Sequence, residues 1–394
     1  MSYSVTDTHS VLTKEITNHL SKKEKKDYGI FFTPSEATDE CVERVKKYSP
    51  SPIDVLEPSC GSGQFIDSVQ RKMPLANITA VEYNDEIYDK IKGTYPDVIH
   101  DDFIDYVPQI KYDLIIGNPP YFVMKKDDVD RSYLTHFDGR PNIFILFIIK
   151  CLGLLKPKGT LCFVLPKNFL NCIYYDKTRK YIFTNFVVQD IFQPSGKYID
   201  TQQDTIVIIV QNIPSVKTSP FVIHMSNYTI FGTPVGICEL TKIKTNSTTL
   251  GKMGFSVSVG KTVWNQHKPS LTSDASKTRL VYSSDIKCGK VGIVTYKNTE
   301  KKNYINKPGG TGKVLLVNRG YGVGEYKFEY CLYNGDTPYL VENHLMCIHG
   351  PDDGSYEKIV SSFDDPRTKK FIVTYFNNNA INTSELANIF PIFI

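Results

Sequence analysis

The sequence has no pair of cysteines in the spacing C-x-x-C, although nine cysteines occur among its 394 residues. An odd number of cysteines without this spacing argues against a disulfide framework and against a zinc ribbon. The eight histidines are scattered, and no metal-site spacing links them, so we expect no bound metal. These absences favour a protein of a reducing cytosol.

Long apolar runs are also missing. The longest, Ile143 to Ile149, ends at Lys150 and is far too short to span a membrane. The first residues, Met1 to Asp7, lack the basic and then apolar layout of a signal peptide. We therefore expect neither secretion nor membrane insertion.

The charge is unevenly distributed along the chain. Residues 1–215 carry 25 basic and 28 acidic side chains, whereas residues 216–394 carry 21 basic and 14 acidic ones. Within 241–329 the count is 16 basic against 5 acidic. This excess is typical either of a solvated lysine-rich face or of a surface that binds a polyanion.

The first half alternates strand-sized apolar runs with helix-like stretches, which predicts an α/β domain of parallel strands and crossover helices. A last apolar run, Thr205–Val210, follows a strand with no room for a helix, so we expect it to be antiparallel. Gln211–Pro220 is polar and bounded by proline, as in a linker. The second half is rich in Thr, Ser, Gly, Tyr and Val, which favours a mostly β domain. The expected strands are 53–56, 78–81, 114–116, 160–165 and 187–191, and the expected helices are 65–73, 85–92, 143–155 and 169–183.

A glycine loop and two acids follow the first strands. Gly61 and Gly63 come after Leu56-Glu-Pro-Ser-Cys60, where backbone can approach a ligand at the carboxyl edge of the sheet. Glu82 ends the second strand, where a carboxylate can accept both hydroxyls of a ribose. Asp102 ends the third, where it can accept an adenine amino group. This ordered set indicates an adenosine site without a pyrophosphate cradle, because the loop is not a full G-x-G-x-x-G.

The fourth strand runs into Gly117-Asn-Pro-Pro-Tyr121. Two prolines fix φ and donate no hydrogen bonds, so we expect Asn118 and the carbonyls around it to be held extended and open to a ligand.

With these motifs the sequence resembles the γ-class amino-methyltransferases of DNA, of the TaqI type, among bacterial and viral type II modification methylases. Gly29-Ile-Phe-Phe-Thr-Pro34 matches their first element, and Asn142–Phe147 with Leu155–Pro166 match the stretch beyond N-P-P-Y. The resemblance covers about residues 29–210. It implies a Rossmann-like methyltransferase fold with a seven-stranded mixed sheet, S-adenosylmethionine as cofactor, and adenine N6 as the methyl acceptor after base flipping.

The resemblance also implies roles for individual residues. Asn118 and the Pro119 carbonyl would accept the amine hydrogens, and Tyr121 and Tyr198 would stack on the extruded base, with Phe192 as the rival of Tyr198. The implied catalytic residues are Asn118, Pro119, Pro120, Tyr121 and Tyr198. The implied cofactor-binding residues are Thr33, Pro34, Glu57, Pro58, Gly61, Gly63, Phe65, Glu82, Tyr83, Asp102, Phe103, Asn118 and Phe147.

We therefore expect a catalytic domain at residues 1–214, with an N-terminal helical extension, and a DNA-recognition domain at residues 215–394. Val259–His267, Asn318–Gly322 and Tyr339–His344 resemble the recognition part of some modification methylases. The expected partner is double-stranded DNA, bound by a monomer in the cytoplasm of a bacterial or virus-infected cell, with a possible cognate restriction endonuclease. Three alternatives stay open: a protein-glutamine methyltransferase of the release-factor type, a cytosine-N4 DNA methyltransferase, and a DNA-binding module with an inactive methylase fold.

Overall fold

The computed structural model of this chain describes residues 10–196, 198–199, 204–215, 218–320, 326–351, 355–376 and 380–394. Contacts divide it into two compact units. The first ends at Ile237 and the second begins at Cys238, except that Met225–Asn227 group with the second. Within the described ranges, no helix combines the length and the apolar character needed to cross a membrane.

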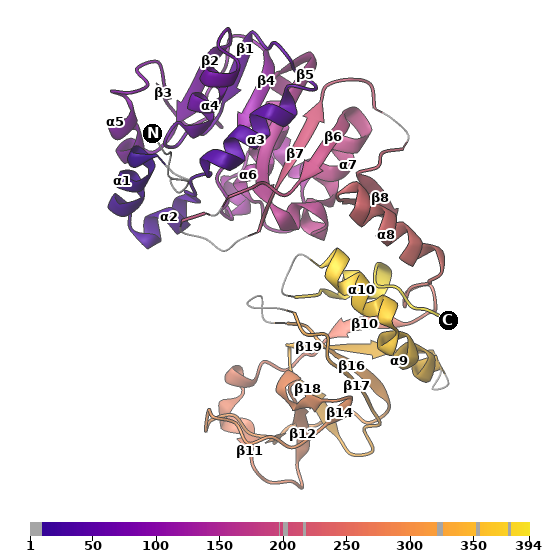
Figure 1. The fold of residues 1–394 in the computed structure, drawn as a ribbon. Helices are drawn as coiled ribbons and strands as arrows, with labels where there is room; N and C mark the ends of the chain where they lie inside the picture. Colours follow the sequence, from indigo (N-terminus) through magenta and orange to yellow (C-terminus); the bar gives the residue numbers. More distant parts are fainter. Residues whose placement is uncertain are drawn as a thin grey trace, which may run out of the picture. The chain divides into compact units, whose positions relative to one another are not determined.

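The first unit is built on a seven-stranded mixed sheet in the order β3-β2-β1-β4-β5-β7-β6 (Figure 1). Strand β7 is antiparallel to both of its neighbours, β5 and β6, and the other pairs are parallel. The predicted seven-stranded mixed sheet and its antiparallel last strand are therefore confirmed. The strands are β1 Asp54–Glu57, β2 Asn77–Glu82, β3 Ile99–His100, β4 Tyr112–Gly117, β5 Leu155–Pro166, β6 Val187–Phe192 and β7 Thr205–Gln211.

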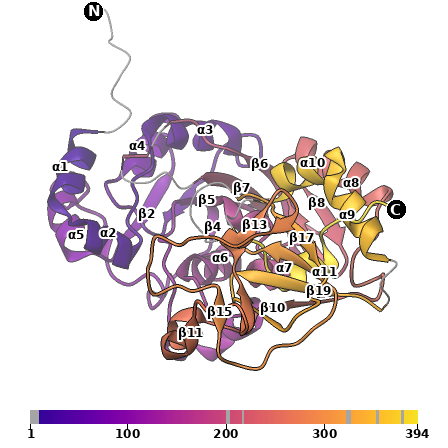
Figure 2. The ribbon, with the colours of Figure 1, turned by 90° about the horizontal axis from the view of Figure 1, so that it is seen from below.

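Alternation of side chains along the strands gives the sheet two buried faces. Val55 of β1 lies in one apolar cluster, with residues of α3 and α4, and the next residue, Leu56, lies in the other, with residues of α6 and α7. Helices α1, α2 and α5 lie near β2, toward the end of the sheet that β3 closes (Figure 2). The helices are α1 Val11–His19, α2 Lys22–Tyr28, α3 Ser35–Val45, α4 Gln64–Lys72, α5 Asp85–Ile91, α6 Ile143–Leu154 and α7 Asp176–Asn185.

The helix expected at residues 169–183 is only partly present. The structure has two 3-10 turns, Lys167–Leu170 and Ile173–Tyr175, before α7 begins at Asp176. The cause is the buried guanidinium of Arg179, whose Nη1 donates to the carbonyls of Phe169 (2.8 Å) and Cys172 (2.9 Å). These two carbonyls accept hydrogen bonds from the Arg179 side chain, and the backbone between them turns instead of continuing as one helix.

The boundary between the units lies later than the expected 214/215. A hairpin of β8, Val222–Met225, and β9, Tyr228–Phe231, follows β7. The Thr229 N–H donates to Asp176 (2.7 Å), and its carbonyl accepts from Arg179 Nε (2.5 Å). These contacts join β9 to α7, so this part of the expected second domain folds with the first unit. Helix α8, Pro234–Thr245, then runs across the boundary in sequence.

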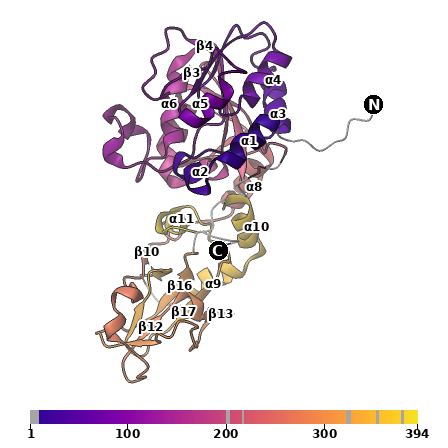
Figure 3. The same ribbon diagram turned by 90° about the vertical axis from the view of Figure 1, so that its left-hand side faces the viewer.

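The second unit is mostly β, as expected, with helices after its last strand. One sheet has the order β10-β19-β16-β17 and another β11-β15-β12-β18, beside the pair β13-β14. Helices α9, α10 and α11 lie near the first of these sheets (Figure 3), where Phe363 of α9 packs on Phe328 and Phe390. Tyr321 and Gly322, from one of the resembling stretches, lie outside the described residues. The bounds are β10 Ser256–Val259, β11 Leu271–Thr272, β12 Thr278–Val281, β13 Ile286–Lys287, β14 Lys290–Val291, β15 Tyr304–Ile305, β16 Val314–Asn318, β17 Tyr330–Tyr333, β18 Tyr339–Val341, β19 Leu345–His349, α9 Tyr356–Asp364, α10 Pro366–Tyr375 and α11 Thr383–Asn388.

Candidate active site

A cavity of about 300 Å³ opens at the carboxyl ends of β1, β2 and β4 in the first unit. This is the edge at which open α/β sheets bind ligands. Nine of the residues singled out from the sequence line it: Pro58, Gly61, Glu82, Tyr83, Asp102, Phe103, Asn118, Pro120 and Phe147. The structure therefore brings the glycine loop, both acids and the N-P-P-Y segment to one cavity.

The glycine loop is held by two of its own backbone N–H groups, which donate to a carbonyl and to a carboxylate of β2. The Cys60 N–H donates to the Val81 carbonyl (2.9 Å), and the Gly61 N–H donates to Glu82 Oε2 (2.8 Å). Gly63 has a φ of +82° and precedes α4, and a Cβ there would lie 2.3 Å from the ring of Tyr95. A side chain at this position would adopt a strained left-handed conformation and would push the Tyr95 ring aside, which explains the second glycine.

Glu82 is buried beneath the loop. Its Oε1 accepts from the Asn84 N–H (2.8 Å), and its Oε2 accepts from Gly61. Burial raises the pKa of the Glu82 carboxyl, and these hydrogen bonds oppose the rise. A carboxylate can accept about four hydrogen bonds, so Glu82 retains acceptor capacity for the hydroxyls of a nucleoside.

Glu57 lies at the end of β1, beside β4. It is 2% exposed, and its Oε2 has no hydrogen-bond partner among the described residues. Burial raises the pKa of this carboxyl well above its usual 4.5. A Cβ on Gly117 would lie 2.3 Å from Glu57 Oε1, so only glycine leaves room for this acid. Glu57 does not line the cavity, so it contacts a bound ligand only if neighbouring residues shift.

The side chain of Asn118 is oriented by the N-terminal segment. Its Nδ2 donates to the Phe31 carbonyl (2.9 Å), which leaves Oδ1 as the acceptor on the other side. The Tyr121 hydroxyl donates to the Val164 carbonyl (2.8 Å) and also lies within hydrogen-bond reach of Asn118 Oδ1. The sequence suggested that Asn118 is open to a ligand, whereas in this structure the tyrosine hydroxyl contacts its acceptor.

Gly29 brings the N-terminal segment against the N-P-P-Y backbone. Its φ is +63°, and a Cβ on it would lie 2.5 Å from the backbone nitrogen of Tyr121. The glycine of the G-x-x-x-T-P element is thus required both by a left-handed conformation and by a close approach. The element positions Asn118 and Tyr121 together.

The two expected stacking tyrosines lie near each other but do not line the cavity at the carboxyl ends of the strands. Tyr198 is half-buried and lines a space of about 10 Å³ with Phe31 and Phe32. The Thr205 hydroxyl donates to the Tyr198 hydroxyl (3.4 Å), and burial raises the pKa of Tyr198 to about 12. Phe192 is 6% exposed within the core, with the Arg44 guanidinium 3.9 Å from its ring centroid.

Several other singled-out residues do not line the cavity. Thr33 is buried near Tyr198, Pro34 precedes α3, and Phe65 packs in the core between α3, α4 and the sheet. Glu57, Gly63, Pro119 and Tyr121 also lie outside its lining. Residues 27–32 also line the cavity, although none of them was among the implied cofactor-binding residues. Their position directly before Thr33 and Pro34 was the available signal.

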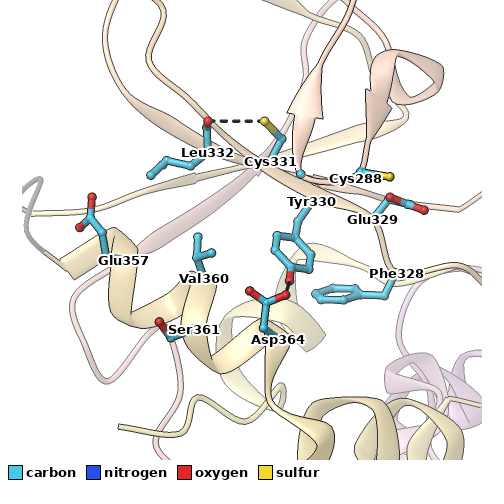
Figure 4. Close-up of a pocket in the computed structure, with 11 residues that line it drawn as sticks. Cys288, Phe328, Glu329, Tyr330, Cys331, Leu332, Glu357, Val360, Ser361 and Asp364 are labelled. Carbon is cyan, nitrogen blue, oxygen red and sulfur yellow. Dashed lines mark hydrogen bonds between the residues drawn. The ribbon is translucent and has the colours of Figure 1, made fainter.

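The described residues contain no group of His, Cys, Asp and Glu side chains that could hold a metal ion. Two grooves among the described residues of the second unit differ in charge. One, of about 600 Å³, is lined by Glu329, Glu357 and Asp364 and by no basic residue, and the Tyr330 hydroxyl donates to Asp364 there (Figure 4). The other, of about 740 Å³, is lined by Lys277, Arg279 and Lys307 and by no acid.

The strand order, the glycine loop and the acids at the strand ends define the predicted Rossmann-like fold of an S-adenosylmethionine-dependent methyltransferase, and its cofactor is S-adenosylmethionine. The cavity fits this molecule, because carboxylates face a space in which a nucleoside would present hydroxyl and amino donors. DrdV, in a cryo-EM structure of its DNA complex, shares the fold, with a TM-score of 0.51 and 13% identity over 86% of this chain and 50% of that one.

The model of the Eco57I restriction-modification methylase family matches residues 64–199. Type II methyltransferase M.CvrRI of Paramecium bursaria Chlorella virus XZ-6E is 29% identical over 385 residues, covering 96% of this chain and 97% of the relative. Modification methylase CviBIII of Paramecium bursaria Chlorella virus NC1A is 27% identical over 401 residues, covering 98% and 99%. These matches confirm the resemblance to type II modification methylases.

Proposed function

We propose that this protein is a site-specific DNA methyltransferase that transfers a methyl group from S-adenosylmethionine to the exocyclic N6 of adenine in a short double-stranded target. The observation that carries the proposal is the position of N-P-P-Y. Asn118 and Pro120 form part of the wall of the cofactor cavity, and the Asn118 amide is fixed by the Phe31 carbonyl.

Methyl transfer to adenine requires that the enzyme make the N6 amine more nucleophilic. The adenine amino nitrogen is a poor nucleophile because its lone pair is delocalised into the ring. Asn118 Oδ1 and the Pro119 carbonyl, placed out of the ring plane, would accept its two hydrogens and favour a pyramidal nitrogen. The lone pair then points at the methyl group, so positioning and electrostatics supply most of the acceleration.

The bound cofactor supplies an electrophilic methyl group on a sulfonium centre. The methyl group would pass from this sulfur to N6. Asn118 is not a strong base, so it would orient the amine without taking its proton, and the extra proton on N6 would leave to water. On the cofactor side, Glu82 would hold the ribose hydroxyls and Asp102 the adenine amino group. Phe103 and Phe147, whose rings are 5.0 Å apart, would supply apolar contacts to the cofactor base.

The target adenine would have to leave the duplex, since N6 cannot be reached inside it. Tyr121 and Tyr198 are the residues that we assign to stacking on the flipped base. In the present structure the Tyr121 hydroxyl is held by the Val164 carbonyl beside Asn118. Base entry would therefore release this hydroxyl from Asn118 Oδ1, and the base amine would take its place.

DNA as the partner is supported by the charge of the second unit and by the relatives named as modification methylases. A groove lined by lysine and arginine suits phosphates better than the acidic groove of Figure 4 does. Arg279 at that groove pairs with Asp285 (2.7 Å), so Lys277 and Lys307 would carry most of its interaction with DNA. We propose monomeric action on DNA.

Incubation with methyl-labelled S-adenosylmethionine, plasmid DNA and a release-factor protein tests the proposal against its alternatives. Label in DNA only is the expected result. Label in the release factor would instead identify a protein-glutamine methyltransferase. DNA binding without label in either would identify an inactive binding module. The matched control is Asn118→Ala, which keeps the glycine loop and the acids.

A further inference from the structure

Lys150, on α6, makes an unusual set of contacts. Its Nζ donates to three backbone carbonyls, those of Phe103 (2.7 Å), Ile104 (2.7 Å) and Tyr106 (2.6 Å). An ammonium group has three N–H donors, so all of them are used within one short segment. In the sequence, Lys150 simply ends the apolar run of this helix. No motif around it indicates a role in the site.

The three carbonyls belong to the turn that follows β3. The N–H groups of Asp105 and Tyr106 donate to the Asp102 carbonyl (3.0 and 2.8 Å), and Asp102 Oδ1 accepts from the Ile104 N–H (2.8 Å). The turn thus resembles a single helical turn whose last carbonyls lack further helical donors. Lys150 satisfies them, as a basic side chain does at a helix C-terminus.

Helix α6 contacts this turn at two points. Phe147 and Lys150 are three residues apart and so share a face of the helix. The Phe147 ring lies 5.0 Å from that of Phe103, and Lys150 Nζ lies 4.9 Å from the Phe103 ring centroid. Asp102, Phe103 and Phe147 line the cofactor cavity, whereas Lys150 does not.

The charge of Lys150 is balanced locally. Burial lowers its pKa, and the nearby carboxylates of Asp105, Asp102 and Asp101 oppose this. Its removal would leave three carbonyls without donors and a group of carboxylates without their cation. Both effects act on the segment that carries Asp102 and Phe103.

We propose that Lys150 is a positioning residue for cofactor recognition: it holds the Asp102–Tyr106 turn so that Asp102 and Phe103 meet the adenine ring of S-adenosylmethionine. The inference rests on the role proposed above for Asp102. It makes no use of the methyl acceptor, so it can fail while DNA methylation stands.

The test compares Lys150→Met with Lys156→Met by calorimetry of S-adenosylhomocysteine binding to the full chain. Lys156 is a matched control, because its Nζ also makes several contacts, with Asp54 (2.7 Å) and Asp113 (2.9 Å), but near the starts of β1 and β4. We expect Lys150→Met to raise the Kd at least about tenfold, the scale of one lost charge-assisted hydrogen bond. Lys156→Met should leave the Kd within about twofold.

A second ligand separates positioning from general loss of structure. An S-adenosylhomocysteine analogue without the adenine 6-amino group should bind the wild-type chain more weakly than the parent compound. In Lys150→Met, removal of the 6-amino group from the ligand should raise the Kd little further, because the contact of this group with Asp102 is already lost. The proposal would be overturned if removal of the 6-amino group weakened binding equally in the wild-type chain and in Lys150→Met. An unchanged Kd for S-adenosylhomocysteine in Lys150→Met would also overturn it.

Two further results complete the test. If Lys150→Met does not fold, Lys150→Arg, which keeps the charge but changes the donor geometry, is measured in the same way. We then expect a smaller dependence on the 6-amino group than in wild type. If the wild-type chain binds both ligands equally, Asp102 does not read the amine and the inference is wrong, while label transfer to DNA remains an independent test of function.

Discussion

Replacement of Gly29 by alanine tests whether the N-terminal segment positions the N-P-P-Y backbone. Gly29 has a φ of +63°, and a new Cβ would lie 2.5 Å from the Tyr121 nitrogen and 3.0 Å from its carbonyl carbon. The left-handed conformation costs an alanine roughly 1 kcal/mol. The close atoms are backbone and cannot rotate away, so Tyr121 and Asn118 must shift. A displacement on the order of 1 Å at reacting groups slows catalysis about 100-fold.

Gly289→Ala is the matched control. Its φ of +73° imposes a similar conformational strain, but no atom lies within 4 Å of its added Cβ. The left-handed conformation alone should cost each variant roughly 1 kcal/mol of unfolding free energy. Gly29→Ala should lose more than Gly289→Ala, because only its Cβ meets backbone atoms. In single-turnover methyl transfer at saturating S-adenosylmethionine, only Gly29→Ala should be slowed about 100-fold. Rates for the two variants within about threefold of each other would refute this reasoning.

Three further predictions concern single side chains. Asn118→Ala should abolish methyl transfer while cofactor and DNA binding, measured by calorimetry, stay near wild type, because its acceptor acts mainly in the transition state; a parallel loss of binding would contradict this. The pKa of Glu82 is raised above its usual 4.5, and only the ionised carboxylate offers all its acceptors to the ribose. Cofactor affinity should therefore fall as pH drops through that raised pKa, and Glu82→Gln should remove this dependence; an equal pH profile in both chains would exclude Glu82 from the site. Tyr198→Ala should lower both the methylation rate and the fluorescence of 2-aminopurine at the target position, since stacking is worth roughly 1–3 kcal/mol per base; if Phe192→Ala does so instead, the second stacking residue is misassigned.

Much of the first unit could be predicted from the sequence because its signals are local. Buried strands such as Leu114–Ile116 are short continuous apolar runs, and parallel strands place their carboxyl ends at one edge. The acids at those ends therefore had to converge, as Glu82 and Asp102 do. The antiparallel last strand followed from the absence of a crossover segment.

What the sequence could not supply depends on contacts between distant residues. Arg179 interrupts the expected helix by binding two carbonyls and joins β9 to α7, and no local pattern marks a buried guanidinium in this role. Lys150 likewise resembles a simple end to an apolar run until its three carbonyl partners are seen. Thr33 and Pro34 were singled out, but the segment just before them lines the cavity, because the chain turns at Gly29.

Nucleoside analysis of the modified DNA tests the central proposal most directly. Plasmid DNA is incubated with the protein and methyl-labelled S-adenosylmethionine, then digested to nucleosides and separated by chromatography with mass detection. The account predicts that the label appears in N6-methyldeoxyadenosine, at one short sequence when the same DNA is read by modification-sensitive sequencing. Label in N4-methyldeoxycytidine, or N6-methyladenine scattered without a common sequence, would contradict it.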